Sequence, residues 1–346
     1  KVVLLLHGMN SDTSTWKDYV RKNFKSCNAI DNGGIIGAVN KFPVNCYAVR
    51  FGAYDAKGEN GLENAKQWAT DNNIRKAGDF STFDQLGKEV DKAVGAIKSY
   101  HPGAHILVIG HSRGGLAARA FLTNQANPEP LNSLWANYVD GLITTGSPHN
   151  GSPVGKIYTW LKNHPHDDCD FFDDCWDDWL AVDQLAFLLK TLDAGLDARR
   201  PVISYLTPGS TQIVKLNNGK VSADIVTGQI RYGGLPLGML SGSYNIFPSD
   251  RNGGKLSLLS SKLTDPAVDF IIGKGINGDN KNLLGDGIVP LNNQSYADAY
   301  VDKTYESNKV LHTDEPKKVT DINSMICKLK SPLIPSVKFD TWVKCP

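Results

Sequence analysis

A serine flanked by glycines lies where an apolar run ends and a helical pattern begins. Residues 105–122 read HILVIGHSRGGLAARAFL, which predicts a buried strand over 105–110 and a helix over 115–122. Parallel strands need a crossover connection, usually a helix, so a strand that turns directly into a helix is typical of parallel α/β sheets. This segment constrains the fold more than any other feature of the chain.

The rest of the chain repeats the alternation of strand and helix patterns. Short apolar runs predict further strands over 2–6, 44–51, 138–146, 223–230 and 239–247. Apolar residues at three- and four-residue steps predict a helix over 83–100. We therefore expect a doubly wound, mostly parallel α/β sheet, with its core built from residues 1–154 and 205–346.

Residues 155–204 interrupt this alternation. They contain many aromatic side chains and aspartates, followed by the segment WLAVDQLAFLLKTL (179–192), which is apolar on nearly every helical face. Such a helix needs cover on several sides or a lipid-like ligand. We interpret 155–204 as a cap or lid inserted over the sheet edge. The alternative is an ordinary structural insertion that packs on the core.

The composition excludes several classes of partner. There are 37 Lys and Arg against 36 Asp and Glu, and no basic stripe or polybasic segment points to nucleic acid or to an anionic membrane surface. The longest apolar runs are too short to span a bilayer, although transient contact with a lipid interface is compatible with them. The opening KVVLLLHG predicts a strand, so any export signal is expected to have been removed or to lie outside this sequence.

The six cysteines fall into three sequence-local pairs. An even number with local pairing fits disulfides and hence a secreted, extracellular protein. The pairing itself does not follow from the sequence, and six buried free thiols are the alternative. No Cys or His cluster has zinc spacing. The three local pairs are Cys27/Cys46, Cys169/Cys175 and Cys327/Cys345.

Ser112 in GHSRGG has the surroundings of a nucleophile. A GxSxG turn between a strand and a helix presents its serine at the carboxyl edge of the sheet, where ligands bind in open α/β folds. The helix that follows directs N–H groups toward a developing oxyanion. The expected donors are the amides of Arg113 and of Met9, which follows the HG turn after the first strand. The alternative is a Gly-rich turn with an incidental serine.

A serine hydroxyl needs a base near neutral pH. In folds with this turn the acid and then the histidine follow the serine along the chain. His312 in KVLHTDE is the candidate base, near the end of the chain. His149 follows a strand too early, and His164 and His166 lie in the acidic part of the expected cap.

An acid is expected to orient His312 and to stabilise its imidazolium form. Asp286 in LLGDGIVP is the preferred candidate, on a tight turn between glycines. Asp250 in PSDRNGG is the second choice. The alternative for Asp286 is a surface turn, because Asp-Gly is a common turn dipeptide.

Six blocks carry a family resemblance: LLLHGMNSDTSTW, GHSRGGLAAR, ITTGSPHNGSP, LTPGSTQIVKLNN, GDGIVP and VLHTDE. Their order is that of α/β-hydrolases, and the chain resembles the secreted bacterial triacylglycerol lipases and their esterase relatives. In that group GTPHxGS follows the serine turn by one βα unit, as GSPHNGS (146–152) does here. The resemblance implies a lid, and no cofactor is expected. It also implies Ser112, Asp286 and His312 as nucleophile, acid and base, with Met9 and Arg113 amides as the oxyanion hole.

The chain departs from this family pattern at two places. Arg113 stands where Met, Gln or Leu is usual, which puts a charge near the acyl pocket or makes a structural pair below the sheet. Some of these lipases hold a structural Ca²⁺ with an aspartate two residues after the catalytic histidine. Asp314 matches that position, whereas Lys318 stands where another oxygen ligand is expected. The aspartates at 167–178 are an alternative Ca²⁺ site, with a solvated acidic face preferred.

The sequence thus predicts hydrolysis of carboxylic esters of lipid-like substrates through an acyl-enzyme. The same triad would also serve an acyltransferase, a phospholipase or a polyester depolymerase. A non-catalytic, lipid-binding version of the fold is the third hypothesis. The oligomeric state is not predicted.

Overall fold

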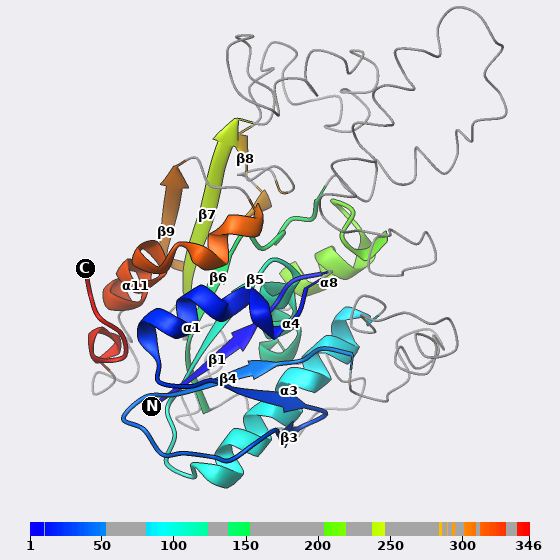
Figure 1. The fold of residues 1–346 in the computed structure, drawn as a ribbon. Coiled ribbons are helices and arrows are strands. Elements are labelled where there is room, and N and C mark those ends of the chain that lie inside the picture. Colours follow the sequence, from blue (N-terminus) through cyan, green and yellow to red (C-terminus); the bar gives the residue numbers. More distant parts are fainter. Residues whose placement is uncertain are drawn as a thin grey trace, which may run out of the picture.

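A mixed, mostly parallel sheet forms the centre of the computed structural model (Figure 1). The structure describes residues 1–9, 11–52, 81–123, 138–152, 204–218, 237–245, 284–285, 289, 293–294, 301–308, 312–329 and 338–346. The nine strands within these described residues lie in the order β3-β2-β4-β1-β5-β6-β7-β8, and β9 also pairs with β7. Their bounds are β1 (Val2–Leu6), β2 (Asn28–Asp31), β3 (Gly34–Ile35), β4 (Asn45–Val49), β5 (Ile106–His111), β6 (Val139–Thr145), β7 (Leu237–Asn245), β8 (Leu284–Gly285) and β9 (Val301–Asn308).

Of the eight pairings between described strands, six are parallel, and those of β3 with β2 and β8 with β7 are antiparallel. The predicted parallel α/β sheet is therefore confirmed. The five expected strands that fall in described residues occur within two residues of their predicted bounds. The expected strand over 223–230 lies outside the described residues.

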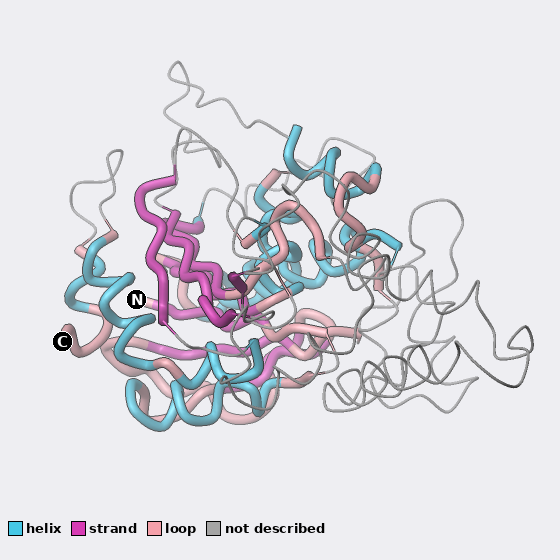
Figure 2. The backbone as a smooth tube through the Cα atoms, turned by 90° about the horizontal axis from the view of Figure 1, so that it is seen from above, coloured by secondary structure: helices cyan, strands magenta, loops and turns pink. Residues whose placement is uncertain are grey.

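Helices cover both faces of the sheet, so the sheet is doubly wound as expected. Figure 2 shows the strands between two groups of helices. The α-helices are α1 (Lys17–Asn23), α3 (Phe83–Tyr100), α4 (Arg113–Leu122), α8 (Thr211–Asn218) and α11 (Val319–Lys328). The short 3-10 helices are η1 (Thr13–Trp16), η8 (His312–Lys317) and η9 (Phe339–Thr341).

Strand β1 contributes to the core on both faces of the sheet. Because side chains alternate along a strand, Leu4 and Leu6 lie in one apolar cluster and Val3 and Leu5 in another. The first cluster includes residues of α3 and α4, and the second includes residues of α1 and α11. Burial on both faces explains why the strand is apolar at every position, as parallel central strands usually are.

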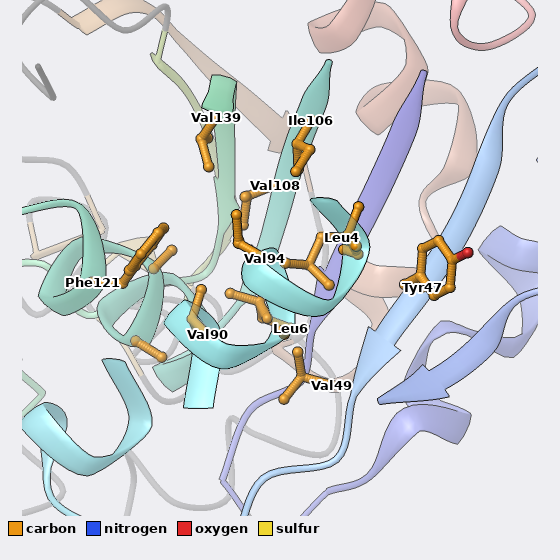
Figure 3. Packing of buried hydrophobic residues seen from close by; sticks show 14 of the residues in the cluster. Leu4, Leu6, Tyr47, Val49, Val90, Val94, Ile106, Val108, Phe121 and Val139 are labelled. Atoms are coloured by element: carbon orange, nitrogen blue, oxygen red, sulfur yellow. The ribbon is translucent and has the colours of Figure 1, made fainter. Parts of the chain in front are cut away.

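The first cluster holds α3 against the centre of the sheet. Figure 3 shows Val90 and Val94 of this helix against Leu6 of β1 and Val108 of β5. The helix begins in a capping box: Thr82 accepts from the Gln85 amide while the Gln85 side chain accepts from the Thr82 amide. Sequence periodicity and capping therefore agree on this helix, which was predicted over the same residues.

Two of the three expected cysteine pairs are disulfides in the structure. Cys27–Cys46 joins the segment before β2 to β4, and Cys327–Cys345 joins α11 to the C-terminal segment. The expectation of disulfides with local pairing is confirmed for these two pairs. Cys169 and Cys175 lie outside the described residues.

The expected cap falls almost entirely outside the described residues, since of 155–204 only the last residue is described. Its interpretation as a lid stays a prediction. Among the described residues, no helix combines the length and the apolar composition that crossing a membrane requires.

Candidate active site

The GHSRGG segment forms a sharp turn between β5 and α4. Ser112 has φ 55° and ψ −129°, and the helix begins at the next residue rather than at the predicted residue 115. Asn32 is the other non-glycine residue with positive φ in the described part of the chain. Strained backbone of this kind concentrates at functional sites, and a serine on a strained strand-to-helix turn is the geometry of a nucleophile elbow.

Glycines let three backbone segments meet at this turn. A Cβ on Gly114 would lie 2.5 Å from the carbonyl oxygen of Leu6. Helix α4 therefore passes β1 so closely that only glycine fits at position 114. A Cβ on Gly8 would lie 2.7 Å from Cβ of Ser112. The loop after β1 therefore rests directly on the serine, because the residue there is glycine.

His312 lies beside Ser112 although 200 residues separate them. The two side chains meet with His312 Nε2 2.8 Å from Ser112 Oγ. His312 is the first residue of η8 and is buried. When Nε2 is unprotonated, the serine hydroxyl donates to it, which is the arrangement that a general base requires.

A second histidine, His111, packs against the ring of His312. It is the last residue of β5, and its ring centroid is 4.7 Å from that of His312. Burial, followed by the neighbouring His312, holds the pKa of His111 well below its usual range. His111 is therefore neutral near pH 7, and its Nε2–H donates to the backbone carbonyl of His312 at 2.8 Å.

A comparison with protein families finds one match, around Ser112. The model described as "PGAP1-like alpha/beta domain" matches residues 77–168, which contain α3, β5, the Ser112 turn, α4 and β6. The match covers less than a third of the chain, and it coincides with the parallel strands around the strained serine. The chain has a doubly wound, mostly parallel α/β fold with the strained serine between β5 and α4. The serine turn and the central strands lie where the sequence predicted them.

Solved structures resemble this chain only distantly. The lin2722 gene product of Listeria innocua is 14% identical, with a TM-score of 0.46, and the alignment covers 95% of each chain. Mature lipase BlEst2 of Bacillus licheniformis is 14% identical, with a TM-score of 0.46 over 91% of this chain and 86% of that one. A thermostable carboxyl esterase of Bacillus coagulans is 13% identical, with a TM-score of 0.37 over 94% and 89%. No curated protein sequence matches the chain.

The two expected oxyanion donors lie next to Ser112 along the chain or in space. Arg113 is the first residue of α4, where N–H groups have no partner within the helix. Its side chain is buried, which fits the structural alternative and not a charge in an open acyl pocket. Met9 follows Gly8, where an added Cβ would lie 2.7 Å from Cβ of Ser112.

The loop that carries Met9 is held by His7. The Phe51 amide donates to His7 Nε2 at 3.3 Å, so the proton of the neutral ring is on Nδ1. Nδ1 in turn donates to the Gly8 carbonyl at 2.8 Å. This bond fixes the peptide between Gly8 and Met9, whose N–H is the proposed donor.

The candidate acids lie outside the described residues. Strand β8 ends at Gly285, immediately before Asp286, and pairs with the end of β7. Asp250 follows β7 and is also outside the described part. The structure therefore leaves both candidates as predictions.

The candidate calcium residue, Asp314, is on the surface of η8. Its carboxylate accepts from Lys317 Nζ at 2.7 Å, and both side chains are about half exposed. Calcium binding at this position stays a prediction. Within the described residues, one group of side chains has metal-ligating atoms close enough to share an ion: His111, His312 and Glu315, within 4.8 Å of one another. A metal there would have to displace the proton that His111 donates to the His312 carbonyl.

His149 in GSPHNGS is structural, in agreement with its exclusion as the base. Arg119 Nη1 donates to His149 Nδ1 at 3.1 Å, so the ring proton is on Nε2 and is donated to Thr144 Oγ1 at 2.9 Å. Burial, together with the Arg119 charge, holds the pKa of His149 well below its usual range. Arg119 also donates to the Leu216 carbonyl, which ties the loop after β6 to α8.

Proposed function

We propose that this chain is an α/β-hydrolase that cleaves carboxylic esters through an acyl-enzyme at Ser112. The observation that carries the proposal is the 2.8 Å contact between His312 Nε2 and Ser112 Oγ on the strained turn at the start of α4. A nucleophile within hydrogen-bond reach of a base is the signature of covalent catalysis.

The proposed reaction has two halves. Ser112 Oγ attacks the ester carbonyl while His312 Nε2 takes its proton, and the amides of Met9 and Arg113 stabilise the oxyanion. The imidazolium then gives its proton to the leaving alcohol. A water molecule, deprotonated by His312, releases the acid and restores the serine. Asp286 is proposed to orient His312 and to stabilise its charged form.

The apolar surroundings of Met9 support a lipid-like acyl group. This partly buried side chain packs against a buried apolar cluster between α3, α4 and α8. An ester with an aliphatic acyl chain would find apolar contacts on this side of the serine. The cluster contains Phe83, Leu116, Ala120, Tyr205, Leu206, Ile213 and Leu216. A lid over 155–204 and secretion belong to the same proposal, the latter supported by the two disulfides.

Substitution of the nucleophile tests this proposal. We expect Ser112→Ala to lower kcat on a soluble p-nitrophenyl ester by several orders of magnitude and to abolish labelling by a fluorophosphonate. Ser147→Ala is the matched control, because it removes the hydroxyl of a buried serine whose Oγ has no hydrogen-bond partner among the described residues. The control should keep both turnover and labelling.

Two results would reject or redirect the proposal. Undiminished turnover in Ser112→Ala would reject Ser112 as the nucleophile, and a wild-type protein that resists labelling would favour a non-catalytic fold. If labelling occurs, tributyrin, phosphatidylcholine and polyester films offered as substrates separate a lipase from a phospholipase and a depolymerase. Transfer of the acyl group to an added alcohol in preference to water would identify an acyltransferase.

A further inference from the structure

The residue before the serine reaches the backbone of the proposed base. His111 Nε2–H donates to the His312 carbonyl at 2.8 Å, and a carbonyl oxygen accepts only, so the proton position on His111 is determined. The bond joins two buried residues. His111, the last residue of β5, thus holds the proposed base, and the next residue, Ser112, is the proposed nucleophile.

A second connection joins the same short helix to the neighbouring strand. Glu315 lies three residues after His312 in η8 and is buried, and it accepts from Thr145 Oγ1 at 3.1 Å. The Glu315 carboxylate is also 3.7 Å from His111 Nε2. Thr145 and His111 are register partners at the ends of β6 and β5, so two adjacent strand ends hold η8 at two points.

The loop after β6 is shaped to admit the Glu315 carboxylate. Gly146 has φ +56°, and a Cβ there would collide with Glu315 Oε2. Only glycine combines this backbone conformation with the empty space. The first residue of GSPHNGS therefore makes room for a carboxylate near Ser112 and His312.

We propose that His111 and the Thr145–Glu315 pair are positioning groups that hold His312 against Ser112. This inference rests on the proposed function, in which His312 is the base. Its physical reason is the distance sensitivity of proton transfer: displacement of a catalytic group by about 1 Å costs on the order of 100-fold in rate. Since η8 is a short 3-10 helix, its own hydrogen bonds position His312 less firmly than a long helix would.

Removal of the His111 donor tests the first connection. We expect His111→Phe, which keeps a ring of similar size, to lower kcat about 10- to 100-fold while KM changes less than about twofold. His111→Gln should recover most of the loss, because its amide N–H extends to the position of Nε2. A fluorophosphonate should still label every Ser112 at the end point, but more slowly. A purely structural role would instead lower the labelled fraction, with no rescue by Gln.

A pair of threonine variants tests the second connection, even if His111→Phe does not fold. Thr145→Val removes the hydroxyl that donates to Glu315, and we expect about a 10-fold fall in kcat. Thr144→Val is the matched control, because its equally buried hydroxyl contacts His149. It should leave kcat within about twofold.

The outcomes separate this inference from the proposed function. Full turnover in His312→Ala would reject His312 as the base and both proposals with it. Loss of turnover in His312→Ala together with unchanged kcat in Thr145→Val, or in folded His111→Phe, would overturn only the positioning role. An equal fall in kcat for Thr144→Val and Thr145→Val would overturn it as well.

Discussion

His312 and His149 both place Nε2 next to a hydroxyl, but His149 is not suited to act as a base. His312 Nε2 is 2.8 Å from Ser112 Oγ, and His149 Nε2 is 2.9 Å from Thr144 Oγ1. Arg119 donates to the other nitrogen of His149, so Nε2 of that ring must carry a proton and cannot accept one. The tautomer, set by the second nitrogen's partner, therefore distinguishes a structural histidine from a candidate base.

Gly8 is the residue whose replacement should disturb the serine most directly. In Gly8→Ala the new Cβ would lie 2.7 Å from Ser112 Cβ and 3.2 Å from Oγ, so either the β1 loop or the serine must move. We expect kcat on a p-nitrophenyl ester to fall by about 100-fold.

Gly103 provides the control for this prediction. A Cβ there would meet nothing within 4 Å, and its φ is not in the left-handed region, so Gly103→Ala should leave kcat unchanged. Equal kcat in the two variants would show that the β1 loop has room to move away from the serine.

At the scale of elements, the candidate site lies where the carboxyl ends of adjacent parallel strands meet. β1 is followed by Gly8, β5 ends in His111 and β6 ends in Thr145. Parallel strands place these ends at one edge of the sheet, where ligands of α/β folds bind. Helix η8 then adds His312 and Glu315 to this edge from far along the chain.

Helix α3 packs against the central strands of the sheet. The capping box at its first turn is expected to stabilise it. We expect Thr82→Ala to lower the free energy of unfolding by about 1 kcal/mol more than Thr82→Ser, because only serine keeps the hydroxyl that caps the Gln85 amide. Urea unfolding followed by circular dichroism measures this difference. Equal stabilities of the two variants would mean that the capping bond contributes nothing.

At the scale of the whole molecule, the buried neutral histidines make stability depend on pH. The pKa of His149 in the folded protein is well below its ordinary value of 6.5, whereas the unfolded chain binds a proton at about that value. The unfolded state therefore gains protons first as the pH falls. Stability due to His149 is fully present above pH 6.5 and decreases below it, by up to about 1.4 kcal/mol per pH unit.

Comparison of the wild type with His149→Gln tests this dependence. We expect the wild type to lose stability more steeply than the variant as the pH is lowered from 6.5 toward 5, whatever their stabilities at pH 8. Urea midpoints measured across this range give both slopes. Parallel curves would contradict the assignment of a neutral, buried His149, because other titrating groups are common to both proteins.

Local patterns in the sequence were enough to predict the centre of the fold. The apolar runs of β1, β5 and β6, the spacing of α3 and the glycine-flanked Ser112 each depend on residues close together in the chain. Short strands with little apolar signal, such as β2 and β3, were not predicted, because their stability comes from pairing with neighbours. The acid and the cap lie in segments that the structure does not describe, so those predictions stay open.

The sequence by itself determined which residue is the candidate nucleophile and which late histidine is the candidate base. Only the tertiary structure decided that His111, inside the motif, and Glu315, three residues past the base, face each other across β5 and η8. A sequence pattern reports the neighbours of a residue along the chain. Contacts between residues 170 to 201 positions apart depend on strand register and on where a loop returns to the sheet, and no local pattern encodes either.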